Sequence, residues 1–489
     1  MNVAFSRAKN GQETCSVNGV LLHSTYNPEQ EAKRFVTSLA FSFAPHAVVV
    51  TEPALSYCAQ FLRQRFPHAL ICAVRYDKAF ATTDKLWDIV FDANSNLSNE
   101  LFNALGEEGV CSALFASWKA SERAYALQHE NAWHEIKNAL IKSRNVLFTR
   151  SYFSSRWILN AVLFCTRVQH VALIERGNCP VVVAASGPSL ASALPYLKKF
   201  RASFFLVAAS SALSVLAACN IVPDICISTD GGFYALAHML QFNTLLKKAP
   251  IALASEAACV RSLFATSSFI PLSYGDGISS ALLERCAIPA MHAERNGTIS
   301  GTAMQFAQNI TDAPVFLCGL DMAPATAFQH AQPNMLEQSA SSYDRRTATK
   351  ETRISAARFS SQSLELYRAW FQSLPDERVK NVFRLSHHFH YAHELGALHD
   401  VDFSFFEKIL HQSPDMPRLT IQHIPAAKQR MSAVKSFVKE HAHSDAWLHE
   451  IFPAEYIAWQ HAQNEKERRW EQLQQKNETL IAKIARLLR

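Results

Sequence analysis

A glycine-containing turn after an apolar run carries the first residues suited to chemistry. Residues 181–185 are valine and alanine, which is typical of a buried parallel strand, and they lead into Gly187, Pro188, Ser189 and Leu190. Glycine lets the backbone approach a ligand closely, and a helix starting at Leu190 would point free N–H groups and its positive dipole end at one place. We predict an anion site here; an ordinary strand-to-helix turn is the alternative.

A second turn, further along the chain, places an acid directly after an apolar run. Residues 224–228 predict a strand, which ends at Asp230, Gly231 and Gly232. An acid at the carboxyl end of a parallel strand suits a ribose or a metal ion. Neither turn has the G-x-G-x-x-G spacing of a dinucleotide fold, and the chain has no Walker motif, so these turns alone do not identify a ligand.

A third turn is rich in glycine, serine and threonine. Gly297, Thr298, Ser300 and Gly301 precede or open a predicted helix that continues to Phe306. A hydroxyl side chain caps a helix well, and the N–H groups of the first turn attract anions. These residues are therefore a second predicted anion site.

Asp321 and His330 follow the next predicted strand, residues 314–318. Residues 323–351 are polar and lack periodicity, and a loop of that length in a compact domain is functional or disordered. A histidine with a pKa near neutrality suits a general base. Because the chain has 20 histidines, a structural or exposed role for His330 is the alternative.

Composition narrows the class of protein. The 489 residues are 49% hydrophobic and 18% charged, which predicts two or three globular domains. The formal charge of +6 is spread along the chain, so we expect no nucleic-acid partner. The 11 cysteines include no C-x-x-C pair, which favours a reduced, cytoplasmic protein without a metal site. The uncharged residues 202–222 contain serines and divide into strand, turn and helix, so we expect no membrane span.

Three stretches in this order resemble the motility-associated factor (Maf) flagellin glycosyltransferases, which share a domain with the archaeal 6-hydroxymethylpterin diphosphokinases (MptE-like). They are GPSL at 187–190, the strand and acid at 224–232, and NGTISGTAMQFA at 296–307 followed by PVFLCGLDMA at 314–323. His330 and the alanine after it match an H-A pair of the family. The same parts occur in bacterial sialyltransferases that use CMP-sialic acid. One departure is that Asp230 precedes two glycines, where many Maf sequences have Asp-Pro.

The resemblance implies transfer of a nonulosonic acid (sialic, pseudaminic or legionaminic type) from a CMP-activated donor to Ser or Thr of a protein, classically flagellin. No cofactor is then required, His330 and Asp321 are catalytic, and the three turns bind the nucleotide. One alternative is an ATP-dependent diphosphokinase with Mg²⁺ on Asp230 and Asp321. Another is a non-catalytic scaffold for a motility partner.

The expected fold class is α/β, with a Rossmann-like parallel-sheet catalytic domain at 165–400 that resembles bacterial sialyltransferases. A smaller α/β scaffold domain at 1–100, whose first turn at Glu52 has no glycine for a phosphate, and a helical bridge at 101–164 precede it. The last region, 401–489, is predicted to be helical. Near its end Trp470, Leu473, Asn477, Leu480, Ile484 and Leu487 step by three and four, which predicts either a short coiled coil that joins two copies or packing on the chain itself.

Overall fold

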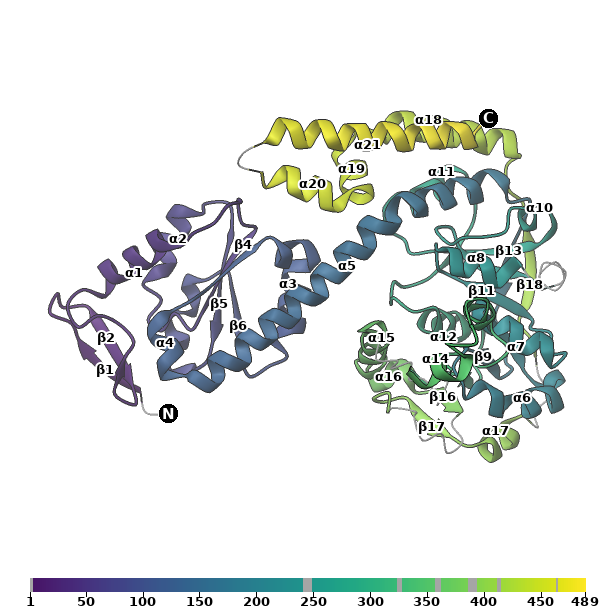
Figure 1. Ribbon diagram of the computed structural model, residues 1–489, viewed down its shortest axis with the longest axis horizontal. Helices are drawn as coiled ribbons and strands as arrows, with labels where there is room; N and C mark the ends of the chain where they lie inside the picture. Colours follow the sequence, from purple (N-terminus) through teal and green to yellow (C-terminus); the bar gives the residue numbers. More distant parts are fainter. Residues whose placement is uncertain are drawn as a thin grey trace. The chain divides into compact units, whose positions relative to one another are not determined.

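The computed structural model in Figure 1 describes residues 3–240, 249–322, 328–356, 362–385, 394–410, 415–462 and 465–489. The chain divides into two compact units. The first unit comprises residues 1–152 and 451–478, and the second comprises residues 153–450 and 479–489. Helices α5 (Ala126–Arg167) and α21 (Lys466–Leu487) each contribute residues to both units.

The first unit is built on a four-stranded parallel sheet with the order β6-β5-β4-β7. Strand β4 is a run of alanine, valine and threonine that is buried throughout, as expected for a central strand covered on both faces. A small antiparallel sheet, β1-β2-β3, precedes it. The elements are β1 (Val3–Arg7), β2 (Glu13–Val17), β3 (Val20–Leu21), α1 (Pro28–Ser38), β4 (Ala47–Thr51), α2 (Cys58–Arg65), β5 (Leu70–Arg75), η1 (Lys78–Leu86), β6 (Ile89–Asp92), α3 (Leu97–Cys111), β7 (Ala113–Ser117), α4 (Lys119–Ala124) and α20 (Pro453–Gln460).

Strand β7 lies inside the stretch 101–164, whose pattern predicted helices only. It pairs in parallel with β4, so it completes the sheet of the first unit. The run Ala-Leu-Phe-Ala-Ser is short and apolar, and periodicity cannot distinguish such a run from part of a buried helix. The expectation of a purely helical stretch was therefore wrong at these residues.

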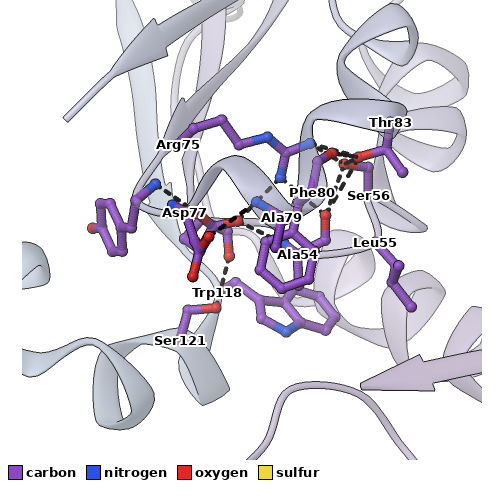
Figure 2. Close-up of polar contacts among 12 residues, drawn as sticks. Ala54, Leu55, Ser56, Arg75, Asp77, Ala79, Phe80, Thr83, Trp118 and Ser121 are labelled. Carbon is purple, nitrogen blue, oxygen red and sulfur yellow. Dashed lines mark hydrogen bonds and ion pairs between the residues drawn. The ribbon is translucent and has the colours of Figure 1, made fainter. Parts of the chain in front are cut away.

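A buried ion pair closes the carboxyl edge of this sheet (Figure 2). Glu52 is fully buried, and its carboxylate accepts hydrogen bonds from Arg75 Nη1 at 3.0 Å and from the N–H groups of Ala54 (3.1 Å), Tyr76 (2.6 Å) and Asp77 (3.1 Å). All N–H donors of the Arg75 guanidinium form hydrogen bonds within the protein. Its other partners are Ala54 O, Ser56 Oγ, Thr83 Oγ1 and Asp84 Oδ1.

The second unit contains a larger sheet with the order β17-β16-β15-β9-β10-β11-β12-β13-β8-β18, and β14 pairs with β13. All pairs are parallel except that of β18 with β8. From β9 the chain proceeds outward to β13 and then returns to β15 on the other side of β9. The order of strands thus reverses between β9 and β15, which is where doubly wound sheets bind their ligands.

The strands of this unit are β8 (His170–Glu175), β9 (Val181–Ala184), β10 (Phe205–Ala209), β11 (Ile225–Ser228), β12 (Ile251–Ala254), β13 (Ser268–Ser273), β14 (Met291–His292), β15 (Val315–Cys318), β16 (Val382–Leu385), β17 (His399–Val401) and β18 (Arg418–Gln422). Its helices are α6 (Leu190–Lys199), η2 (Arg201–Ser203), η3 (Ser210–Ala212), α7 (Leu213–Ala218), α8 (Phe233–Leu240), α10 (Leu263–Thr266), α11 (Gly277–Arg285), α12 (Ile299–Ile310), α13 (Met335–Ser341), α14 (Lys350–Ala356), α15 (Gln362–Gln372), α16 (Asp376–Val379), α17 (Phe403–Ile409), α18 (Ala427–His441) and α19 (Asp445–Ile451).

The predicted core strands are present, and two details differ. Strand β18 lies in the region 401–489 that was predicted to be helical, where it extends the sheet at β8. The predicted loop 323–351 contains α13 and the start of α14; residues 323–327 of that loop lie outside the described residues. Helices α14 and α15 follow, and residues 357–361 between them also lie outside the described residues.

Residues 202–222 divide into η2, β10, η3 and α7, as predicted. Of the helices that the structure describes, none combines the length and the apolar character needed to cross a membrane. In α21, Leu473, Asn477, Leu480 and Ile484 are all buried within the single chain. Packing on the chain itself therefore accounts for the periodic pattern of this helix.

We predict that Glu52→Ala lowers the free energy of unfolding of the first unit by about 3–5 kcal/mol, because it leaves the Arg75 guanidinium buried without its counter-charge. Urea unfolding, with hydrogen exchange at the amides of β4 and β5 to assign the transition, measures this loss. Acetate should restore part of the stability by occupying the vacated carboxylate position. The exposed Glu471→Ala is the control, and a loss below about 1 kcal/mol for Glu52→Ala contradicts the prediction.

Candidate active site

The turns after β9 and β15 lie against each other at the carboxyl edge of the larger sheet. Ala185 N–H donates to Cys318 O at 2.9 Å, and Gly187 N–H donates to Gly319 O at 2.8 Å. A Cβ at Gly187 would lie 2.4 Å from Gly319 O and 2.6 Å from Asp321 Oδ2. Glycine is therefore required at this position for the packing of two turns of the protein.

Asp321 closes the turn that was predicted to bind phosphate. The residue is 3% exposed, and its Oδ2 accepts a hydrogen bond from Ser189 N–H at 2.7 Å. Burial raises the pKa of the Asp321 carboxyl, while the hydrogen bonds from Ser189 and the charge of Arg384 oppose that rise. The carboxylate thus sits at the N-terminus of α6, where a helix favours negative charge.

This arrangement changes the expected role of residues 187–190. The N–H groups of Gly187 and Ser189 are used inside the protein, Pro188 has none, and Leu190 N–H bonds to Gly187 O at 3.0 Å. A phosphate cannot take these groups while the turn keeps this conformation. A larger side chain at Gly187 would meet backbone and not empty space, so we expect Gly187→Val to disturb the fold.

Asp230 lies in the turn that follows β11. Its Oδ1 accepts a hydrogen bond from Gly232 N–H at 2.8 Å. A Cβ at Gly231 would lie 2.5 Å from Trp157 Cδ1, so this glycine gives the indole room against the turn. Burial and, to a smaller extent, the negative charge of Asp230 raise the pKa of the hydroxyl of Tyr367 on α15.

The N-terminus of α12 lies beside the same tyrosine. Thr298 Oγ1 accepts from Ser300 N–H at 3.3 Å, so threonine caps the helix as predicted. Gly297 has a φ of +75°, and a Cβ there would lie 3.7 Å from Tyr367 Cε1. A Cβ on Gly301 would meet Trp370 at 2.8 Å. Tyr367 therefore lies beside the start of α12, where Thr298 already satisfies the Ser300 N–H.

His330 lies next to the turn after β9. Ala331 N–H donates to Ser186 O at 2.8 Å, which ties the chain beside His330 to this edge of the sheet. His330 is partly buried, and this burial lowers its pKa. The imidazole of His330 is accordingly neutral at physiological pH and able to accept a proton.

His238 on α8 is a second histidine at this edge. It is 5% exposed, and within the described part of the chain its Nδ1 has no hydrogen-bond partner. Burial, and to a smaller extent the charge of His330, lower the pKa of His238 to about 4. Sequence reasoning missed both His238 and Tyr367, because each stands alone in its helix and belongs to no motif.

The two predicted acids share an edge but no common contact. Strands β15 and β11 are separated by β9 and β10, so at the usual strand spacing their ends lie roughly 14 Å apart. Asp321 belongs to the β9–β15 junction, whereas Asp230 belongs with Tyr367 and α12. Within the residues that the structure describes, no three His, Cys, Asp or Glu side chains lie close enough together to hold a metal ion.

Comparisons with known proteins agree with the motifs. Residues 157–326 match the family model described as 6-hydroxymethylpterin diphosphokinase MptE-like. The structure of the Maf glycosyltransferase from Magnetospirillum magneticum AMB-1 aligns with 99% of this chain and 91% of that chain, with a TM-score of 0.54 and 11% identity. Residues 157–326 are thus similar to the MptE-like family, and the fold of the chain is similar to that of the Maf glycosyltransferase. The predicted resemblance and the α/β fold class are thereby confirmed.

A relative by sequence is an uncharacterized protein from Treponema pallidum (strain Nichols), which is 32% identical over 298 residues. The alignment covers 60% of this chain and 64% of that protein, so this chain spans less than two thirds of its relative.

We predict that protonation of His238 weakens the fold in acid. The unfolded state takes up the proton near pH 6.5 and the folded state only near pH 4, so stability falls as the pH drops through that interval. The contribution is up to about 3 kcal/mol. His238→Phe should remove this part of the pH dependence in denaturant titrations between pH 7 and 4. The exposed His423→Gln should retain it, and a slope in His238→Phe equal to that of wild type would refute the idea.

Proposed function

We propose that this protein is a glycosyltransferase that moves a nonulosonic acid from a CMP-activated donor to a Ser or Thr hydroxyl of a protein, with flagellin as the expected acceptor. The observation that carries the proposal is the group formed by Asp230, Tyr367 and the start of α12 at the ligand edge of an MptE-like domain, with His330 at the same edge. The Maf-like fold of the whole chain supports it.

The donor phosphate is assigned to the first turn of α12. The N–H groups at a helix start attract an anion without needing a metal, although Thr298 takes that of Ser300 here, and they gain strength as negative charge develops on the departing CMP. Asp230 is assigned to the ribose hydroxyls, which a carboxylate at a strand end accepts. Residues 187–190 then support the site through the β9–β15 junction and do not contact the phosphate.

The acceptor hydroxyl needs a base, and His330 is assigned this role. Its partly buried imidazole is held neutral, so it can remove the hydroxyl proton as the oxygen attacks the anomeric carbon of the sugar. Asp321 is assigned a positioning role, because its carboxylate fixes the turn at Ser189 next to which His330 lies.

The diphosphokinase reaction is the second candidate, because the matching family model bears that description. It would place Mg²⁺ on Asp230 and Asp321. Their strands are three apart in the sheet, and Asp321 already holds Ser189 N–H, so this pair does not fit a single ion. The donor set therefore favours the transferase over the kinase.

We predict that His330→Gln lowers turnover by roughly 10²–10⁴-fold with little change in donor affinity, because a general base is lost and no donor contact is removed. Mass spectrometry of a Ser- and Thr-containing acceptor incubated with CMP-activated nonulosonic acid measures the transfer. The exposed His423→Gln serves as the matched control. Equal turnover of His330→Gln and wild type would leave the enzyme without this base.

Thermal unfolding separates the candidate functions. Binding of CMP or CDP should raise the melting temperature without added metal, and ATP with Mg²⁺ should not. Stabilisation by ATP and Mg²⁺ alone would favour the diphosphokinase. The absence of any nucleotide effect would favour a non-catalytic scaffold that binds a motility partner.

The rate of transfer should fall in acid with a midpoint below pH ~6.5, the ordinary histidine value. The sign follows from burial: it disfavours the imidazolium of His330, so the base stays unprotonated further into acid. Rate measurements at saturating donor and acceptor from pH 8 to 5 give the midpoint. A midpoint above 7 would show that another group, or a strongly anionic environment, controls the proton.

A further inference from the structure

The first unit contains a cavity of about 310 Å³ that the proposed function does not use. It lies at the carboxyl ends of β5 and β6, between Asp77 and Lys78 on one side and Asp92 on the other. Ala81, Val90 and Phe91 supply its apolar wall. A volume at the small end of the range for ligand pockets admits one ring system with a few polar groups.

The topology places this cavity where doubly wound sheets bind nucleosides. The chain runs from β4 to β5 to β6 and then returns to β7 on the far side of β4, so the order reverses at β4. In such sheets a phosphate lies after the first strand, an acid after the second strand holds the ribose, and the base lies toward the third. Here the corresponding places are Glu52, Asp77 and the wall formed by β6.

The phosphate place is already filled by the protein. The Glu52 carboxylate takes the N–H groups of Ala54, Tyr76 and Asp77, and Arg75 has no donor left for an outside anion (Figure 2). The backbone here is held in an uncommon shape, with φ of +37° at Glu52, +47° at Ala54 and +60° at Ser56. Such strain persists only where the surroundings over-determine it, so this side of the cavity is rigid.

The ribose place is open. Asp77 is partly exposed; its Oδ1 accepts from Ala79 N–H at 2.9 Å and its Oδ2 from the Tyr125 hydroxyl at 3.1 Å. Each carboxylate oxygen can accept a second hydrogen bond, which leaves two positions for the neighbouring hydroxyls of a ribose. The exposed Asp92 adds a further acceptor across the cavity. The lining carries Asp77, Asp84 and Asp92 against one lysine, Lys78, and the Arg75 guanidinium has no donor left, so this negative charge disfavours a ligand phosphate.

We propose that this cavity binds a nucleoside without a 5′-phosphate, with its ribose on Asp77 and its base against Ala81, Val90 and Phe91. The proposal does not rest on the transferase function, because that function uses residues of the second unit. It predicts one site per chain that distinguishes a nucleoside from the corresponding nucleotide.

The test is isothermal titration calorimetry of the full chain with cytidine, uridine, adenosine and guanosine, and with their 5′-monophosphates. Two substitutions on the same helix, η1, provide the matched pair. Both alanines are exposed, but only Ala81 lines the cavity, so Ala81→Leu fills it and Ala79→Leu does not. We expect at least one nucleoside to bind at one site, with affinity at least tenfold lower in Ala81→Leu and unchanged in Ala79→Leu.

The 5′-monophosphate of that nucleoside should bind this site at least tenfold more weakly. Binding of CMP to the second unit can be distinguished from binding to this cavity, because Ala81→Leu should leave the affinity of the second unit for CMP unchanged. The proposal is overturned if no nucleoside gives saturable binding, if Ala81→Leu and Ala79→Leu bind it equally, or if the monophosphate binds the Ala81-dependent site as tightly as the nucleoside. Failure of the transferase assay has no bearing on these outcomes.

Discussion

The contact between Gly187 and Gly319 is the constraint on which the site in the second unit depends. The two backbones meet through one hydrogen bond of 2.8 Å, and a Cβ on either residue would lie within about 2.5 Å of a carbonyl oxygen. Because the turns after β9 and β15 come this close, the carboxylate of Asp321 reaches Ser189 N–H. The chain beyond Asp321 then begins at a fixed point, and the hydrogen bond from Ala331 to Ser186 returns it to the same edge beside His330.

Both units close a strand-end turn with one of their own carboxylates. In the first unit Glu52 accepts backbone N–H groups after β4, and in the second Asp321 accepts Ser189 N–H at the start of α6. A carboxylate at these positions satisfies donors that a bound phosphate satisfies in nucleotide-binding sheets. The consequence differs between the units. The second unit offers the start of α12 to the proposed donor phosphate, whereas the ligand proposed for the first unit lies in the cavity beside Asp77.

Local sequence predicted the elements better than the contacts between them. The strands around 181–185 and 314–318 were predicted to within a residue or two, because uncharged β-branched runs flanked by turns have few alternatives. Strands β7 and β18 were missed, since each has only five residues in a stretch that otherwise reads as helical. That Asp321 would occupy Ser189 N–H could not be seen, because 132 residues separate the two. Tyr367 and His238 had no motif to mark them.

In the proposed transfer, the burial of His238 and the partial burial of His330 oppose an effect of the anionic donor. A negative charge near His330 favours the imidazolium and would raise its pKa, which removes the base that the reaction needs. Burial of His330 works against that rise. His238 is kept neutral by its own burial. Within the described residues, the buried Nδ1 of His238 has no hydrogen-bond partner, and such an atom lowers the stability of the fold. This cost falls at the edge of the sheet where the proposed transfer needs a neutral imidazole as its base. In a more polar environment, the charge of the bound donor would favour protonation of that base.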